Sequence, residues 1–492
     1  MQERSFLAFD LGAESGRAML GRLRDQTLIL EEKARFANGM VYLLGHWRWN
    51  IFRLFEDIHQ ALRLSVGGGA SPPESLGVDT WGVDFGLLGP GGCFLDLPVA
   101  YRDPRTEGVM DEVFLRIPRE RIYGLTGIQF LPFNSLFQLY ALRLSGSPLL
   151  GIARDLLFMP DLFTYMLTGK RSTEFTSATT SQLYNPVTGG WEPELLDLLE
   201  LSPSLMQPVV PPGTVVGTLL PDLARSTGLG EIPTVAVAAH DTASAVAAVP
   251  AQGKEWAYIS SGTWSLMGIE VEKPIIEPRS LALNFTNEGG VGGRFRFLKN
   301  ICGLWLLQAC RRTWQKDQPC SYEELVRAAE EAPAFRSLVD PDAETFLNPD
   351  DMPGAIREAC RRSRQPVPDS MPAVTRCILE SLALKYRHVL DQLRTVAPQP
   401  ITQLYVIGGG SRNAVLNQFT ANATGLPVSA GPAEATTAGN ILMQAQCLGA
   451  VSGIPEIRRI VSRSFSLDCF EPLDVREWDQ AYTRFQDLLE EG

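Results

Sequence analysis

The sequence predicts an α/β protein built as two halves of similar architecture. Three short segments carry this prediction. Residues 6–17 and 258–268 each have the pattern of a strand, a short polar turn and a second strand. Residues 404–413 have the pattern of a buried strand that ends in three glycines. Because each segment begins a new run of sheet, we expect two similar domains that close on a nucleotide between them.

The first segment, FLAFDLGAESGR, has small residues in its turn and Asp10 at the end of its first strand. Small residues allow successive backbone N–H groups to turn toward a phosphate. A carboxylate such as that of Asp10 can hold a hydrated Mg²⁺, which prefers carboxylate and water ligands. For this loop taken alone, an ordinary hairpin turn is the alternative interpretation.

The other two segments differ in how specifically they indicate a nucleotide site. Hydroxyls in a turn usually bond the local backbone, so the segment SSGT at 260–263 is the weaker signal. Gly408, Gly409 and Gly410 are more specific, because we expect them to have no packing use and to lie against a flat ligand. A helix predicted at 413–423 would point its N-terminus at the same place. Together, the three segments favour a nucleotide site.

Hydrophobic periodicity predicts alternating strands and helices in the first half. Strands are expected at 6–9, 18–23, 75–78, 85–88 and 234–238, and helices at 51–64, 110–116, 136–145, 161–167 and 193–199. In the second half we expect strands at 256–260 and 266–271 and amphipathic helices at about 371–396 and 475–490. We place the boundary near residues 243–256, which gives domains of residues 1–245 and 246–492.

Length and charge restrict the possible functions. A chain of 492 residues is too long for one compact core. Its net charge of −12 argues against nucleic-acid and membrane-surface partners, so we expect only small-molecule substrates. The chain enters a strand by Ser5, and its most apolar stretch, 235–249, is too short to span a bilayer. We therefore expect a cytoplasmic protein, as a monomer or small homo-oligomer.

Eight cysteines in a chain of this length do not indicate a disulfide framework, and no two of them have the sequence spacing of metal ligands. Cys360 and Cys377 flank a proline-containing loop and can approach one another. A reduced pair is the default expectation for them.

Residues suited to binding a sugar, the molecule that would accept the phosphate, lie in the first half of the chain. Trp81 beside Gly82 offers a flat apolar face and one N–H donor, which suits a sugar ring; a core tryptophan is the alternative. Arg102 and Asp103 lie in a polar, proline-bounded loop that is consistent with hydroxyl recognition; a solvated loop is the alternative.

The segment AHDTA at 239–243 is the most specific part of the sequence. A buried alanine-rich strand should end on His240 and Asp241 only where the pair is needed, because burying an unpaired carboxylate is costly. The residues from Thr242 onward predict a helix N-terminus, whose dipole favours an ionised Asp241. Such an aspartate can accept the proton of a hydroxyl that attacks a γ-phosphate. A plain helix cap is the alternative for Asp241, and a structural histidine is the alternative for His240.

These segments resemble the FGGY family of carbohydrate kinases on the actin-like ATPase fold. The match runs nearly end to end and includes DLGAESGR, DTWGVDFGLL, PVAYRDPRT, AHDTASAV, SSGTWSLMG, TNEGG, FLKNICGLWLLQ, VIGGGSRN and AGPAEATTAGN. The resemblance implies two actin-like (ribonuclease H-like) domains with a nucleotide cleft between them. HDTASAV and SSGTWSLMG are typical of one subfamily, which implies ATP- and Mg²⁺-dependent conversion of L-rhamnulose to L-rhamnulose 1-phosphate. A kinase for another ketose, such as fuculose or xylulose, and an actin-like sugar sensor without phosphoryl transfer are the alternatives.

The resemblance also implies roles for single positions. Asp241 would be the proton acceptor. The sugar contacts would be Gly82, His240, Asp241, Thr242 and Asn300. The ATP-binding positions would be Ala13, Glu14, Ser15, Gly16, Arg17, Thr263, Gln308 and Gly409, with Gly408 and Gly410 beside it. Glu14 departs from the small residues usual in this loop, so we expect it to face solvent and to leave phosphate binding to backbone amides and Arg17.

Overall fold

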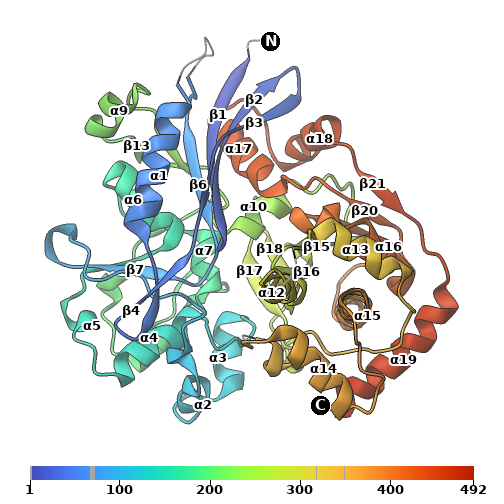
Figure 1. The fold of residues 1–492 in the computed structure, drawn as a ribbon. Coiled ribbons are helices and arrows are strands. Elements are labelled where there is room, and N and C mark those ends of the chain that lie inside the picture. Colours follow the sequence, from blue (N-terminus) through green and yellow to red (C-terminus); the bar gives the residue numbers. More distant parts are fainter. Residues whose placement is uncertain (1–2, 67–71, 317–318, 348, 492) are drawn as a thin grey trace. The chain divides into compact units, whose positions relative to one another are not determined.

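The computed structural model describes residues 3–66, 72–316, 319–347 and 349–491 (Figure 1). The chain forms two compact units, and each is described by itself. Unit 1 comprises Met1–Pro250, Glu270–Phe297 and Ala435–Ser464, and unit 2 comprises Ala251–Ile269, Leu298–Glu434 and Phe465–Gly492. Among the residues that the structure describes, none of the helices has both the length and the apolar character needed to cross a membrane.

The central sheet of unit 1 has the strand order β13-β14-β6-β1-β2-β3. Its strands are β1 (Arg4–Leu11), β2 (Ser15–Arg24), β3 (Thr27–Ala37), β6 (Leu76–Thr80), β13 (Thr214–Thr218) and β14 (Pro233–Ala236). Strand β1 pairs antiparallel with β2 and parallel with β6, and β6 pairs parallel with β14. In this register Asp10 on β1 lies between Arg17 on β2 and Asp79 on β6.

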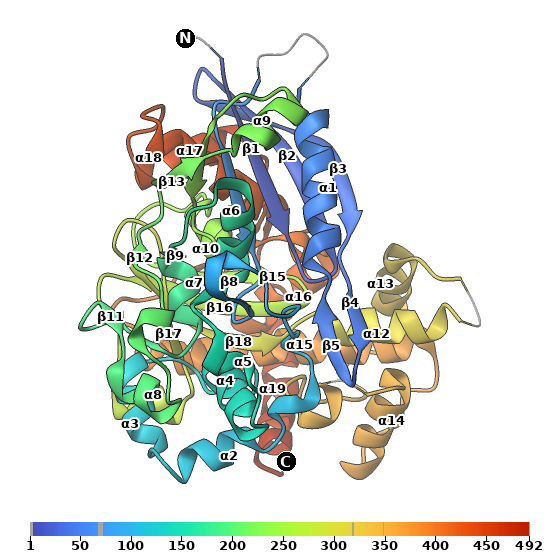
Figure 2. The same ribbon diagram turned by 90° about the vertical axis from the view of Figure 1, so that its left-hand side faces the viewer.

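Helices cover both faces of this sheet. Because side chains alternate along a strand, Leu7, Phe9 and Leu11 enter one core with residues of α1 and α6. Asp10 points to the opposite face, where Thr437 of α17 donates to it. Helix α1 runs alongside β1 to β3 (Figure 2). The helices of unit 1 are α1 (Ile51–Leu64), α2 (Val109–Phe114), α3 (Arg119–Thr126), α4 (Ser135–Leu144), α5 (Leu149–Ile152), α6 (Met159–Thr168), α7 (Phe175–Thr180), α8 (Pro193–Leu198), α9 (Pro221–Thr227), α10 (Asp241–Ala247), α11 (Pro278–Ala282), α17 (Ala435–Cys447) and α18 (Ile454–Ser464).

A second apolar core of unit 1 gathers residues of α2, α3, α4 and α8 around the antiparallel pair of β7 and β8. The short strands of unit 1 are β4 (Met40–Leu43), β5 (His46–Trp49), β7 (Phe85–Leu88), β8 (Asp155–Phe158), β9 (Thr173–Glu174), β10 (Tyr184–Asn185), β11 (Gly190–Trp191), β12 (Val209–Val210) and β17 (Thr286–Gly289). These elements supply several of the loops that hold the candidate site.

The strands of unit 2 follow the order β18-β16-β15-β19-β20-β21. They are β15 (Trp256–Ser261), β16 (Trp264–Val271), β18 (Phe295–Cys302), β19 (Gln403–Ile407), β20 (Val428–Ala430) and β21 (Asp468–Phe470). Strand β15 pairs antiparallel with β16 and parallel with β19, the same local arrangement as β1 with β2 and β6. The helices are α12 (Trp305–Trp314), α13 (Tyr322–Glu331), α14 (Met352–Arg362), α15 (Met371–Arg394), α16 (Ala414–Thr424) and α19 (Val475–Glu491).

The two predicted hairpins and the glycine-ended strand are all present, and α1 and β7 have the predicted limits. The two units share the hairpin-plus-parallel-strand pattern that the sequence predicts for the two halves. The division of the chain at residue 245 and the nucleotide cleft stay predictions.

Candidate active site

The segment AHDTA lies where the central sheet of unit 1 meets helix α10. Thr80 donates its N–H to the carbonyl of Ala239 at 2.9 Å, so the segment is bound to the end of β6. Helix α10 begins at Asp241, and His240 is its cap residue, so Asp241 is not a plain helix cap. Its Oδ1 accepts from the N–H of Thr242 at 2.5 Å and from Thr242 Oγ1 at 3.1 Å. The side chain of Asp241 is nevertheless 32% exposed, which leaves it accessible to a ligand.

The electrostatic surroundings make Asp241 a stronger base than an ordinary aspartate. Burial raises its pKa above the usual value, and the charge of Asp10 adds to the increase. His240 and the hydrogen bonds from Thr242 lower the pKa and so offset part of the change. A general base works best when its pKa approaches the working pH, so this shift suits proton abstraction.

Two further carboxylates lie near Asp241. Asp79 is completely buried, its Oδ2 accepts from Asn440 at 2.6 Å, and its Oδ1 has no hydrogen-bond partner in the described part of the chain. Burial raises the pKa of Asp79 well above its usual value, and Asp10 and Asp241 raise it further. Asp10 Oδ2 accepts from Arg17 at 2.5 Å and from Thr437 at 3.2 Å. This end of the sheet therefore gathers three carboxyl groups, of which Asp10 is neutralised by Arg17 and Asp79 favours its protonated form.

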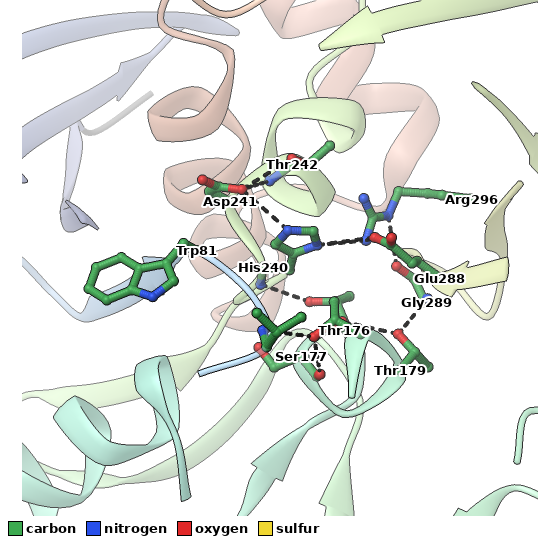
Figure 3. A network of polar contacts seen from close by, with 12 residues as sticks. Trp81, Thr176, Ser177, Thr179, His240, Asp241, Thr242, Glu288, Gly289 and Arg296 are labelled. Atoms are coloured by element: carbon green, nitrogen blue, oxygen red, sulfur yellow. Dashed lines mark hydrogen bonds and ion pairs between the residues drawn. The ribbon is translucent and has the colours of Figure 1, made fainter. Parts of the chain in front are cut away.

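His240 connects Asp241 to a buried ion pair (Figure 3). Its Nε2 lies 3.5 Å from Asp241 Oδ1, and its Nδ1 lies 3.3 Å from Glu288 Oε2 and 3.1 Å from Arg296 Nη2. Arg296 donates to Glu288 at 3.0 Å. We did not predict Glu288 or Arg296 as site residues. The only signal in the sequence was the motif TNEGG, which contains Glu288.

The structure brings Gly82 to the same place but gives Trp81 an internal role. A Cβ atom on Gly82 would lie 3.4 Å from His240 Nε2, so this glycine allows close approach to the imidazole. Trp81 is only 7% exposed, packs on Trp49 with 4.3 Å between ring centroids, and donates its Nε1–H to Asp84 at 3.0 Å. The expectation that its N–H is available to a sugar is therefore wrong, because a buried donor needs an internal acceptor.

Asp103 is also committed to internal contacts. Its side chain is 1% exposed; Oδ1 accepts from the N–H of Arg105 and contacts His46 Nδ1, and Oδ2 accepts from the N–H of Trp47. The structure accounts for this carboxylate without a ligand. Arg102 is half-buried and lies over the ring of Tyr101, 5.2 Å from its centroid. The assignment of both residues to the sugar stays a prediction.

Residues 13–17 cover the end of the turn after β1 and the first three residues of β2. Ala13 and Ser15 are partly exposed, and Glu14 is exposed, as expected. Packing explains why position 16 is a glycine, because a Cβ there would lie 2.1 Å from the ring of Phe36. The guanidinium of Arg17 is paired with Asp10, so a phosphate at this loop would share that charge with a carboxylate.

The glycines after β19 show which position is open to a ligand. The expectation that none has a packing use is wrong for Gly408 and Gly410. Gly408 has φ +80°, and a Cβ on Gly410 would lie 2.0 Å from Ser261 Oγ. A Cβ on Gly409 would meet nothing within 4 Å. Only Gly409 combines the glycine-rich turn with open space.

The other nucleotide candidates of unit 2 lie around the end of β15. The carbonyl of Thr263 accepts from the N–H of Trp305, at the start of α12. Gln308, one turn further along α12, has a buried Oε1 without a hydrogen-bond partner among the residues that the structure covers. An unpaired buried acceptor of this kind suits a ligand contact. Asn300 is half-buried on β18.

Comparison with known proteins assigns this architecture to a class. Residues 5–248 match the N-terminal domain of the FGGY family of carbohydrate kinases, and residues 257–447 match its C-terminal domain. The chain belongs to the FGGY family of carbohydrate kinases. This confirms the resemblance seen in the sequence.

Among curated relatives, the chain is 51% identical to a rhamnulokinase of Bacteroides thetaiotaomicron, covering 99% of this chain and 100% of the relative. It is 44% identical to a rhamnulokinase of Pectobacterium carotovorum, covering 99% and 97%. The fold is similar to that of ligand-bound xylulose kinase from Lactobacillus acidophilus, with TM-score 0.81 and 15% identity over 99% of this chain and 97% of the other. Glycerol kinase of Plasmodium falciparum with ADP has TM-score 0.79 and 15% identity over 99% and 98%. These structures confirm the predicted α/β, actin-like fold.

Proposed function

We propose that this carbohydrate kinase transfers the γ-phosphoryl group of ATP to L-rhamnulose, giving L-rhamnulose 1-phosphate and ADP. The relatives named rhamnulokinase, which share 44–51% identity over almost the whole chain, support this acceptor. The observation that carries the mechanism is the accessible carboxylate of Asp241, whose Oδ1 is held by Thr242 and whose pKa is raised by burial.

Asp241 acts as the general base in this proposal. It removes the proton of the sugar hydroxyl, and the oxygen forms a bond to the γ-phosphorus as the bond to the ADP oxygen breaks. The proton stays on the Asp241 carboxyl, and the phosphoryl group stays on the sugar. The raised pKa favours the proton transfer.

The remaining residues bind and orient the substrates. Gly82, His240 and Thr242 lie around Asp241 and contact the sugar, while Trp81 supplies an apolar surface without its N–H. Asn300 is a further sugar contact. The ATP contacts are residues 13–17 in unit 1 and Thr263, Gln308 and Gly409 in unit 2. The open space at Gly409 supports this assignment, as does the Oε1 of Gln308, which has no hydrogen-bond partner among the described residues.

Mg²⁺ fits the carboxylates at the end of the sheet. Mg²⁺ usually keeps several waters and binds one or two carboxylates together with phosphates. In the described residues, no group of three or more acidic, histidine or cysteine side chains is arranged to hold a metal ion. Asp10 would hold it through water, and Asp79, whose Oδ1 lacks a hydrogen-bond partner within the described ranges, lies on the neighbouring strand. When bound, the ion would neutralise phosphate charge.

The test is a coupled ADP-release assay with L-rhamnulose, L-fuculose, D-xylulose and glycerol, together with detection of the sugar phosphate. We expect L-rhamnulose to stimulate ADP formation most, with one sugar phosphate for each ADP. Equal activity with xylulose would contradict the substrate but leave a kinase. Sugar binding without a phosphorylated product would favour the sensor alternative. A cytoplasmic location and a monomeric or small homo-oligomeric state stay predictions from the sequence.

A further inference from the structure

Two separate sets of contacts hold His240. Its backbone N–H donates to Thr176 Oγ1 at 3.0 Å, and the N–H of Ala239 donates to Glu174 Oε2 at 3.1 Å. Thr176 Oγ1 in turn donates to the same Glu174 oxygen. The beginning of α7 therefore fixes the main chain of His240 and leaves the orientation of the imidazole to other groups (Figure 3).

The groups that meet the imidazole are Glu288 and Arg296. Glu288 Oε2, Arg296 Nη2 and His240 Nδ1 form a triangle with sides of 3.0, 3.1 and 3.3 Å. Arg296 is 0% exposed, and its Nε donates to the carbonyl of Gly289 at 2.8 Å, so the guanidinium is tied to the strand that carries Glu288. The side chain of Glu288 is 7% exposed.

This triangle determines which imidazole nitrogen reaches the candidate sugar site. With Nδ1 held by the ion pair, Nε2 is the nitrogen directed toward Asp241 Oδ1, at 3.5 Å, and toward Gly82. If the ring turned over, Nδ1 would leave the ion pair, and the buried arginine and glutamate would lose a polar neighbour. Losing such a neighbour is costly in a buried place.

We propose that Glu288 and Arg296 are positioning residues that act on phosphoryl transfer through His240. They keep His240 Nε2 directed at the carboxylate of Asp241 and at the acceptor hydroxyl. Neither residue needs to touch the substrate. This inference rests on the proposed phosphoryl transfer, because its effect is read from that reaction.

The test is a double-mutant cycle with Glu288→Ala and His240→Ala, measured with whichever ketose the wild-type enzyme phosphorylates. We expect Glu288→Ala to lower kcat/KM for the sugar by roughly 10- to 100-fold, the range for loss of a group that orients an active-site residue. The KM for ATP should change by less than about twofold. In the His240→Ala background, Glu288→Ala should lower kcat/KM by less than about twofold further, because residues that act through one another are not additive.

Glu270 provides a matched control. It is a buried carboxylate of unit 1, 6% exposed, and it is paired with the 9% exposed Arg458 at 2.6 Å. Glu270→Ala removes a similar ion pair, so we expect a similar loss of melting temperature and an unchanged kcat/KM. Glu288→Gln keeps the size of the side chain and an oxygen acceptor, so it should restore part of the lost activity even if Glu288→Ala folds poorly.

Three results would overturn the proposal. The first is a fall in kcat/KM for Glu288→Ala that persists in full in the His240→Ala background. The second is an equal fall for Glu270→Ala, which would make the effect one of general stability. The third is wild-type kinetics for a folded Glu288→Ala. Failure of the proposed function would look different, because the wild-type enzyme itself would then form no sugar phosphate.

Discussion

The candidate catalytic region of unit 1 and the candidate nucleotide region of unit 2 are built in different ways. In unit 1, charged and polar side chains contact one another: Asp10 with Arg17, Asp79 with Asn440, and His240 with Glu288 and Arg296. In unit 2, the turn after β19 is made of glycines, and Gly408 and Gly410 approach Ser261 closely.

The unit 2 region depends on close packing of small residues. Gly408 and Gly410 lie against Ser261, and Gly409 alone borders open space. If the proposed assignments hold, we expect the chemistry to depend on side-chain charge in unit 1 and the fit of ATP to depend on backbone shape in unit 2. Substitutions in the two regions should fail in different ways, as loss of turnover in the first and as loss of stability or of ATP affinity in the second.

The largest effect is expected at Asp241. Asp241→Asn removes the base but keeps the shape of the side chain, so turnover should fall by roughly 10²- to 10⁴-fold. Sugar and ATP should still bind, which isothermal titration can measure. Asp222→Asn is the control, because Asp222 has a 91% exposed side chain on α9 and should keep full turnover. Near wild-type turnover in Asp241→Asn would remove the general-base assignment.

The next effect tests packing at the glycine turn. A methyl group on Gly410 would enter the space of Ser261 Oγ, so Gly410→Ala should destabilise the protein by about 1–3 kcal/mol, as overpacking typically does. Thermal unfolding checks this. Gly409→Ala has open space and is the paired control, with an expected change close to zero. If both variants melt alike, the two glycines do not differ in the way the structure indicates.

Gly409→Val tests ligand fit in the same turn. The branched side chain would occupy the open space where we place ATP, so the KM for ATP should rise by about tenfold or more, equivalent to ~1.4 kcal/mol. Sugar affinity and melting temperature should change little. Steady-state kinetics with varied ATP measures the effect. An unchanged KM in a folded variant would exclude the turn from the ATP site.

The smallest effect concerns pH. The base must be deprotonated to work, and burial raises the pKa of Asp241, so activity should be lost at a higher pH than for an ordinary aspartate, whose pKa is ~3.9. The profile of kcat/KM for the sugar against pH should therefore have its acid limb above that value. An acid limb at or below it would show that the environment of Asp241 does not act as the structure indicates.

Much of the fold could be predicted from local patterns. Helix α1 was predicted with its observed limits because its apolar residues recur at helical spacing; the structure adds that Asn50 caps it and accepts from the N–H of Arg53. Strand β3 was missed, since its residues are mostly exposed or half-buried. Four charged residues within five positions, 31–35, also weaken the alternation of apolar and polar residues that indicates a strand. Edge strands of this kind take their structure from the neighbouring strand, here β2.

The sequence by itself determined the family and was enough to propose Asp241 as the base, because the HDTA segment and the two hairpin turns are short and contiguous. Only the tertiary structure decided how each polar group is used. Glu288 lies 48 residues beyond His240, and the fold brings them to 3.3 Å; the indole N–H of Trp81 and the carboxylate of Asp103 are taken by internal partners. The physical reason is that a buried polar group needs a hydrogen-bond partner, and the fold decides which groups lie close enough to be that partner, whatever their separation in the sequence.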